Sequence, residues 1–148
     1  MYNEIMDAVT QKLAGLFPAE EGYTIYTDAV EQGLSEPCFF VGFLDPSEKP
    51  MIGPRYYRSS PMYIQFLPGE MEQPSRELNR VLDILMGQMR VIELKSGRKL
   101  NATGKSGRIE DGVLTFFIQF HVFEVYDTPQ EESMSEIKVN ERGGTDGR

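Results

Sequence analysis

Residues 108–126 of this chain, RIEDGVLTFFIQFHVFEVY, contain its strongest fold signal. Asp111 and Gly112 form a dipeptide that favours a type I′ turn, because both central residues of that turn need positive φ. The alternation after the turn predicts a strand over 113–126, paired with 108–110. One face of this strand is apolar and predicts core positions: Leu114, Phe116, Ile118, Phe120 and Val122. The other face is mixed in polarity, and we expect it either to make a few contacts with helices or to contact another subunit: Thr115, Phe117, Gln119, His121 and Phe123.

Two helices and further strands are predicted around this hairpin. Apolar residues at helical spacing indicate helices over 2–17 and 74–89. Strands are predicted over 23–27, 38–44, 55–67, 91–94 and 98–103, with a loop over 47–53 and a turn over 104–107. Pro61 inside one strand implies an edge position, a bulge or two successive strands. The order predicts an α+β fold, with a mixed, largely antiparallel sheet and two main helices packed on one face.

Composition excludes several classes of protein. The chain has 148 residues, 40% of them hydrophobic, which suits one ordinary domain with its own core. The single cysteine excludes an internal disulfide, and the single histidine excludes the His pairs of common metalloenzymes. A net charge of −8 argues against a general nucleic-acid binder. No cofactor is expected, and the chain is predicted not to be an enzyme.

The chain is predicted to divide into one α+β domain over 1–126 and an acidic tail over 127–148. The change to a polar, glycine-rich composition after residue 126 suggests that the tail is mobile alone and orders on a partner subunit. Neither a secretory signal nor a long apolar segment is evident, so we expect synthesis and folding in a cytoplasm and no membrane partner.

Charge is unevenly distributed along the sequence. Residues 1–36 contain seven acids and one lysine, a net charge of −6, and residues 90–108 contain six bases and one acid, a net charge of +5. These segments are either opposite-sign patches suited to head-to-tail association, or ordinary solvated charge. The stretch Arg55-Tyr-Tyr-Arg58 suits a protein interface first, a protected edge strand second and a nucleic-acid patch third.

Candidate catalytic motifs have simpler explanations. Gly104-Lys-Ser lacks the upstream glycine of a P-loop. Cys38 and His121 would form a thiol–imidazole pair only if their strands were neighbours, and each is more readily explained as a core or sheet-face residue. The aromatic and basic residues are therefore candidates for a protein interface: Arg55, Tyr56, Tyr57, Arg58, Arg98, Lys99, Lys105, Arg108, Phe117, His121 and Phe123.

Many short segments, in order, resemble one known family. They are 2–9 (YNEIMDAV), 25–40 (IYTDAVEQGLSEPCFF), 53–58 (GPRYYR), 64–68 (IQFLP), the helix from Arg76, 107–117 (GRIEDGVLTFF) and 131–134 (EESM). These segments resemble phage tail terminator-like proteins, encoded in the tail-assembly modules of phages and prophages of Gram-positive bacteria.

The resemblance implies a structural role in the virion and a mixed sheet with helices on one side. It implies a homo-hexameric ring at the head-proximal end of the tail, which stops tube polymerisation and offers a docking surface to the head–tail connector or neck protein. Its implied partners are other copies of itself, the tail tube protein and, in a contractile tail, the sheath protein; the subfamily resembled favours contraction. DNA is expected to pass through the lumen without specific binding.

Other functions remain open from the sequence. One is a different neck or head–tail completion ring protein. Another is a small enzyme that uses Cys38 and His121. A third is a monomeric module that binds peptides by adding a strand to a sheet edge.

Overall fold

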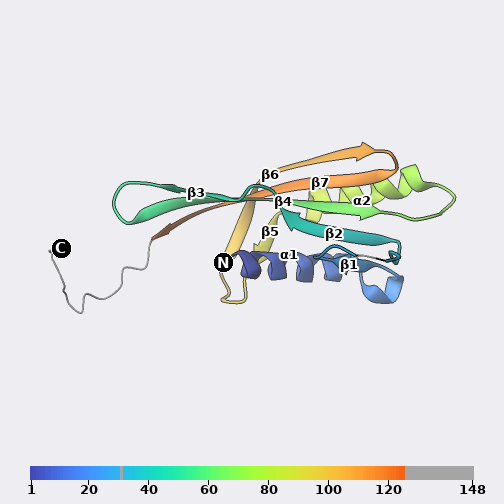
Figure 1. Ribbon diagram of the computed structural model, residues 1–148, viewed down its shortest axis with the longest axis horizontal. Coiled ribbons are helices and arrows are strands. Elements are labelled where there is room, and N and C mark those ends of the chain that lie inside the picture. The colour runs from blue at the N-terminus through green and yellow to red at the C-terminus, as the bar shows by residue number, and fades with distance from the viewer. Residues whose placement is uncertain (31, 126–148) are drawn as a thin grey trace.

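The computed structural model describes residues 1–30 and 32–125, with two helices on one face of a seven-stranded sheet (Figure 1). In chain order the elements are α1 (Tyr2–Leu16), the short 3₁₀ helix η1 (Ala19–Glu21), β1 (Thr24–Tyr26), β2 (Cys38–Phe43), β3 (Ser47–Pro50), β4 (Arg55–Leu67), α2 (Pro74–Gln88), β5 (Val91–Glu93), β6 (Lys99–Glu110) and β7 (Val113–Val125). The α+β prediction is confirmed. The predicted acidic tail lies outside the described residues.

The sheet is built around β4 and β7, its two longest strands. Its order is β1-β2-β4-β7-β6-β5, and β3 adds to β4 outside this path. The β4–β7 register runs from Arg55 opposite Val125 to Phe66 opposite Leu114. The β1–β2 pair is parallel and the other pairs are antiparallel, so the sheet is mixed and largely antiparallel, as predicted.

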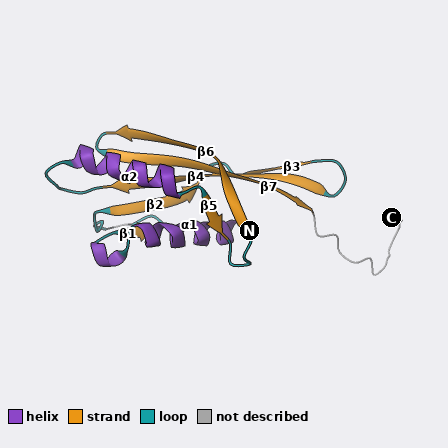
Figure 2. Ribbon diagram, turned by 180° about the vertical axis from the view of Figure 1, so that it is seen from behind, coloured by secondary structure: helices purple, strands orange, loops and turns teal. Residues whose placement is uncertain are grey.

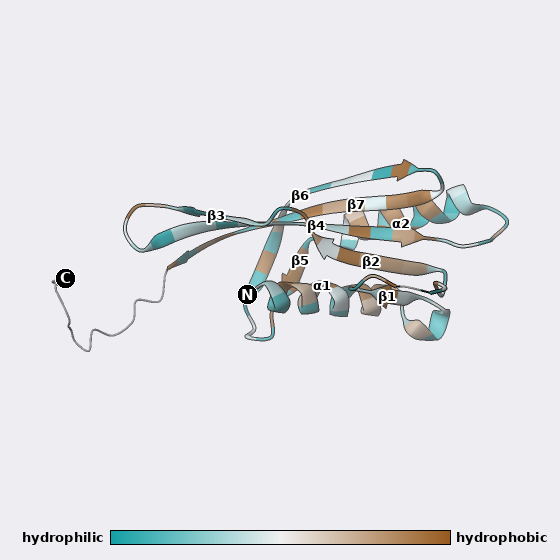
Figure 3. Ribbon diagram, in the orientation of Figure 1, coloured by the Kyte–Doolittle hydropathy of each residue, from teal (hydrophilic) through white to brown (hydrophobic). Residues whose placement is uncertain are grey.

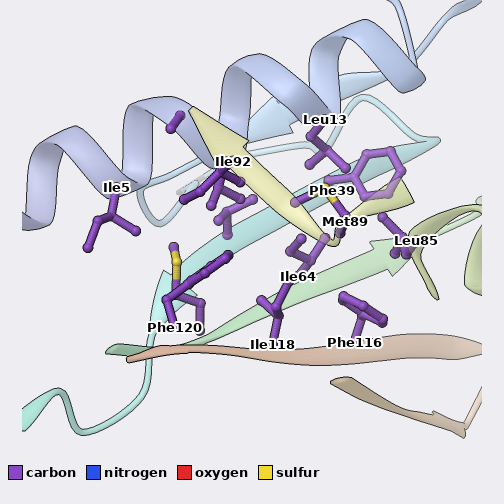
Figure 4. Close-up of a cluster of buried hydrophobic side chains, with 14 of the residues drawn as sticks. Ile5, Leu13, Phe39, Ile64, Leu85, Met89, Ile92, Phe116, Ile118 and Phe120 are labelled. Atoms are coloured by element: carbon purple, nitrogen blue, oxygen red, sulfur yellow. The ribbon is translucent and has the colours of Figure 1, made fainter. Parts of the chain in front are cut away.

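The core lies between the central strands of the sheet and a layer formed by α1, α2 and β5, the end strand of the sheet, which crosses over to lie against α1 (Figure 4). Figure 4 shows side chains of α1 and β5 directed toward those of β4 and β7. The predicted core positions on β7 are all buried, and α2 contributes Leu78, Val81 and Leu85. Burial of each large apolar side chain stabilises the fold by about 1.5–3 kcal/mol.

The β6–β7 connection has the predicted geometry. Asp111 and Gly112 have φ values of 55° and 75°. Two successive positive φ angles are those of a type I′ turn, whose twist matches that of the flanking strands. The dipeptide therefore fixes the register of the hairpin.

Two predictions about the strands are wrong. Ser47–Pro50, expected to be a loop, forms β3 against β4. The expected turn at 104–107 lies inside the continuous strand β6, with a register shift between Ala102 and Gly104. Both segments are largely exposed, so neither shows the apolar alternation that marks a half-buried strand.

Pro61 is accommodated inside β4 where the neighbouring strand changes. β3 pairs with residues 56–59 and β2 pairs with residues 62–67. The Pro61 carbonyl accepts a hydrogen bond from the Leu44 amide in the connection between β2 and β3 (2.8 Å). The missing proline N–H thus falls at a break between two partner strands, where it removes no ladder hydrogen bond.

One end of the sheet extends beyond the helices as an arm, defined here as residues 47–59 and 121–125. β2 pairing ends at Met62 and β6 pairing ends at Phe120, so only β3 and β7 flank the first part of β4. Figures 1 and 2 both show this three-stranded arm projecting past α1 and α2.

Candidate functional site: a projecting arm and an uncovered sheet face

Arg58 holds the base of the arm to the body of the protein. Its side chain lies on the core side of β4, and the residue is 8% exposed. The guanidinium donates to Glu48 Oε2 (2.7 Å) and to the Tyr56 hydroxyl (3.2 Å), and it lies over the ring of Tyr2 in α1 (4.8 Å to the centroid). A planar cation suits this site because it can bond in its plane and stack on its face. Arg58 therefore supports the arm within its own protomer.

The opposite side of the arm is joined by aromatic and polar contacts. The Tyr57 hydroxyl is hydrogen-bonded to His121 Nδ1, and the Tyr57 ring packs against Phe123 (4.9 Å between centroids). On the core side, Glu124 lies opposite Tyr56 in the sheet and forms an ion pair with Arg98, before β6. These contacts fix the relative positions of β4, β7 and the β5–β6 turn.

Three buried polar atoms near the arm base have no hydrogen-bond partner among the described residues. They are Arg58 Nε, Ser60 Oγ and His121 Nε2. Ser59 lies opposite His121 in the sheet, so all three atoms belong to one stretch of β4 and β7. Buried unpaired polar groups cost stability and in native proteins concentrate at functional sites.

The arm also concentrates exposed apolar side chains. Of the eight large hydrophobic residues that are exposed among the described residues, four lie on the arm: Met51, Ile52, Phe123 and Val125. Ile52, in the β3–β4 turn, is 92% exposed, and Phe123 is 64% exposed. Figure 3 shows apolar segments at this turn and at the end of β7. Grouped apolar exposure on a projecting element indicates a contact surface for another molecule.

The sheet face opposite the helices is uncovered by any described element. It carries half-buried side chains that contact one another in its plane. Arg108 lies over the Phe117 ring (5.6 Å to the centroid), and Gln119 donates to Ser59 (3.0 Å). The Tyr63 ring occupies the space above Gly42, where a Cβ would come within 2.7 Å of it. This face is neither a second core nor a fully polar surface.

The structure brings together only some of the residues predicted from the sequence. Tyr57, His121 and Phe123 form one cluster, and Phe117 and Arg108 lie farther along the same face. Arg55 and Lys99 are exposed. Tyr56 contacts Arg58 on the core side, and Lys105 donates to the Met86 carbonyl (2.6 Å).

The acidic segment 1–36 and the basic segment 90–108 lie side by side in part of the structure. Lys12 of α1 donates to the Val91 carbonyl of β5 (2.8 Å), and Glu4 and Asp7 line the same open hollow as Lys95. The acidic helix and the basic β5–β6 region are therefore neighbours in one protomer. Opposite charges balance locally at this place.

The structure does not form the thiol–imidazole pair. Cys38 lies opposite Leu67 and His121 opposite Ser59. Those β4 positions are eight residues apart, about 26 Å at 3.3 Å per residue. Burial, with a smaller contribution from Glu36, raises the pKa of the Cys38 thiol, which opposes thiolate formation.

Residues 1–30 and 32–125 contain no other grouping typical of a phosphate-binding or metal-binding site. Gly104-Lys-Ser lies within a strand, not in a phosphate-binding loop. In this part of the chain, no three side chains that could bind a metal ion lie close enough together to share one. Its helices are too short or too polar to cross a membrane.

Sequence reasoning missed three residues that the arm depends on: Tyr2, Glu48 and Ile52. The first looked like a helix residue, and the others fell in a predicted loop. The only sequence signal for this region was the Arg-Tyr-Tyr-Arg stretch at 55–58, which suggested that the start of β4 makes contacts with another protein. It gave no sign that β3 would extend the strand into an arm.

Comparison with known proteins identifies the family. A family model described as "Phage tail terminator protein" matches residues 4–133. No curated protein matches the chain. Among the solved structures that match, one covers 88% of this chain over 99% of its own length, at 12% identity and a TM-score of 0.41. The family model covers most of the sequence, and it confirms the resemblance that the short segments indicated. The chain therefore belongs to the phage tail terminator proteins.

Proposed function

We propose that this protein caps the head-proximal end of a phage tail as a homo-hexameric ring. In this role it stops polymerisation of the tail tube and presents a docking surface to the head–tail connector. The observation that carries the proposal is the family match over residues 4–133. The protein acts by binding and geometry, without a cofactor.

The surface of the protomer supports an assembled state. Helices cover only one face of the sheet, and the other face holds half-buried aromatic side chains. The arm adds exposed apolar side chains on a strand pair that extends beyond the body. A ring subunit needs such surfaces, because it contacts a neighbour on each side as well as the tube.

The proposed partners follow from this position in the virion. They are neighbouring copies of the chain, the tail tube protein, the neck protein above it and, in a contractile tail, the last sheath ring. DNA passes through the central opening without specific binding, which agrees with a net charge of −8. The acidic segment over 127–148 is proposed to bind a partner subunit.

A tube-growth assay tests the capping function. Short tubes of the cognate tail tube protein are incubated with this protein, and fresh tube protein is then added. Electron microscopy measures the length distribution. Capped tubes should stop lengthening at one end, whereas continued growth from both ends, with this protein in excess, contradicts the proposal.

A variant separates capping from chemistry. Cys38 is buried at the start of β2, and alanine retains a small apolar side chain there. Cys38→Ala should cap tubes as wild type does. Loss of capping by a folded Cys38→Ala protein would instead favour a role for the thiol.

A further inference from the structure

The two ends of the sheet carry different surfaces, and strand register defines them. One end is the arm. At the other end, β2 begins with Cys38 opposite Leu67, the last residue of β4. β7 begins beside the same end of β4, with Leu114 opposite Phe66. The connections between strands at that end therefore lie close to one another, as Figures 1 and 2 show from opposite sides.

Exposed carboxylates collect at this second end, called here the acidic end. They come from η1, from the residues before β2, from the β4–α2 loop and from the β6–β7 turn: Glu20, Glu21, Glu36, Glu70, Glu72, Glu110 and Asp111. Glu36 and the β4–α2 loop are in contact, since a Cβ on Gly69 would come within 2.9 Å of the Glu36 Cβ. The nearby bases are fewer: Arg76, Arg108 and Arg80, of which Arg80 forms an ion pair with Glu77.

The tip of the arm has the complementary composition. Residues 49–55 include Lys49 and Arg55 and no acidic residue. Both bases are exposed, and neither forms an ion pair within the described part of the chain. Between them, Met51 and Ile52 are 44% and 92% exposed. The acidic end also has exposed apolar residues, Met71 and Ile109.

These two surfaces cannot meet within one protomer. β4 joins them and has 13 residues, which is about 40 Å at 3.3 Å per residue. Its pairing with β7 along almost its whole length keeps it extended. A contact between arm tip and acidic end therefore requires a second molecule.

We propose that the arm tip of one copy docks on the acidic end of the next copy. This inference rests on the proposed ring function and names the surfaces that join its subunits. Lys49 and Arg55 face the carboxylates, while Met51 and Ile52 cover the apolar residues among them. Since the two surfaces differ, the contact is head-to-tail, and its repetition closes a ring when the rotation between copies allows.

Charge reversal of each surface tests the contact. The arm variant is Lys49→Glu with Arg55→Glu, and the acidic-end variant is Glu70→Lys with Glu72→Lys. A matched control, Arg90→Glu with Lys95→Glu, reverses two exposed bases that lie on neither surface. Association is measured by sedimentation velocity over a concentration series and by the amount bound to tube ends. Each test variant should weaken self-association about tenfold, and the control should not.

Mixing the variants identifies the partner as a second copy. The arm-reversed and end-reversed proteins should associate better together than either does alone. In the mixture, the acidic arm tip of one variant meets the basic end of the other, so the two surfaces again have opposite charge. No recovery on mixing, or wild-type association by both variants, overturns the proposed contact. If wild type forms rings in those experiments, the capping function stands and only the contact fails. If wild type neither self-associates nor binds tubes, the proposed function fails as well.

Ile52→Ser provides a test that does not alter charge. The side chain is almost fully exposed, so the fold should keep its wild-type midpoint of unfolding. Self-association should weaken severalfold. Unchanged association of this variant contradicts a docked arm tip.

Discussion

The guanidinium of Arg58, on β4, lies 4.8 Å from the ring centroid of Tyr2, at the start of α1. This contact joins the arm to the helix layer at the point where the sheet leaves the body. Tyr2 in turn packs edge-on against Phe43, the last residue of β2 (5.3 Å between centroids). The direction of the arm is thus set by side chains from three separate elements.

Replacing Arg58 should loosen the arm and lower stability. Arg58→Ala removes the stacking on Tyr2 and leaves Glu48 without its cation, at an expected cost of about 2 kcal/mol. Arg58→Lys, which keeps the charge but not the planar fork, should fall between alanine and wild type. Urea unfolding measures these differences. Equal midpoints for all three proteins contradict a supporting role for Arg58.

Adjacent phenylalanines on β7 should differ sharply in their importance for stability. Phe116 is fully buried against the helices, whereas Phe117 is half-buried on the uncovered face. Phe116→Ala should cost about 3–5 kcal/mol because it leaves a cavity, and Phe117→Ala about 1 kcal/mol. Chemical denaturation of both variants checks the assignment of the two faces. Similar costs for the two would contradict it.

The β6–β7 turn should be sensitive to a side chain at Gly112. Its φ of 75° is in the left-handed region, so Gly112→Ala should destabilise the protein by about 1 kcal/mol. Gly112→Asn should cost less, because asparagine tolerates that region. Gly87 in α2 has open space around it, and Gly87→Ala should instead stabilise by up to about 1 kcal/mol. Thermal unfolding would reveal the opposite signs, and matching signs would refute the turn argument.

Stability should depend on pH through Glu77. Hydrogen bonds from the Arg80 guanidinium (2.9 and 2.8 Å) are the main cause of a lowered pKa for this carboxyl, and the Tyr23 hydroxyl also donates to it. A lowered folded-state pKa gives stabilisation that is present above the ordinary value of about 4.3 and is lost as pH falls through the folded-state value.

Glu77→Gln should therefore be less stable than wild type at pH 7, by up to about 1 kcal/mol, since Arg80 is half-exposed. The difference should shrink at pH 3. Glu72→Gln, in the preceding loop, removes an exposed carboxylate that forms no ion pair with the described residues and serves as control. A Glu77→Gln deficit that is the same at both pH values contradicts this assignment.

The elements with strong periodicity could be predicted from sequence. Asp111-Gly112 fixed the hairpin because its backbone requirement is local, and the alternation after it separated the two faces of β7. α2 was equally clear from the spacing of Leu78, Val81 and Leu85. These signals depend on one buried face, which the sequence pattern records directly.

The arm could not be predicted because β3, one of its three strands, lacks a buried face. Ser47–Pro50 is exposed throughout, so its pairing with β4 depends on register set elsewhere. Arg58 was expected at an interface, yet its position on the core side of β4 follows from a pairing that no local pattern shows. Likewise, α1 and β5 are brought together only by the tertiary fold. The sequence therefore could not show that the acidic residues of α1 lie beside the basic residues of the β5–β6 region.

Copies of this protein are proposed to form a ring at the end of the tail tube. The most direct test is its solution mass by light scattering coupled to size exclusion, over a range of concentrations, with and without cognate tubes. A mass of six protomers, or a monomer that assembles as six copies on each capped tube end, is the expected result. A protein that stays monomeric at every concentration and ignores tube ends would contradict the claim.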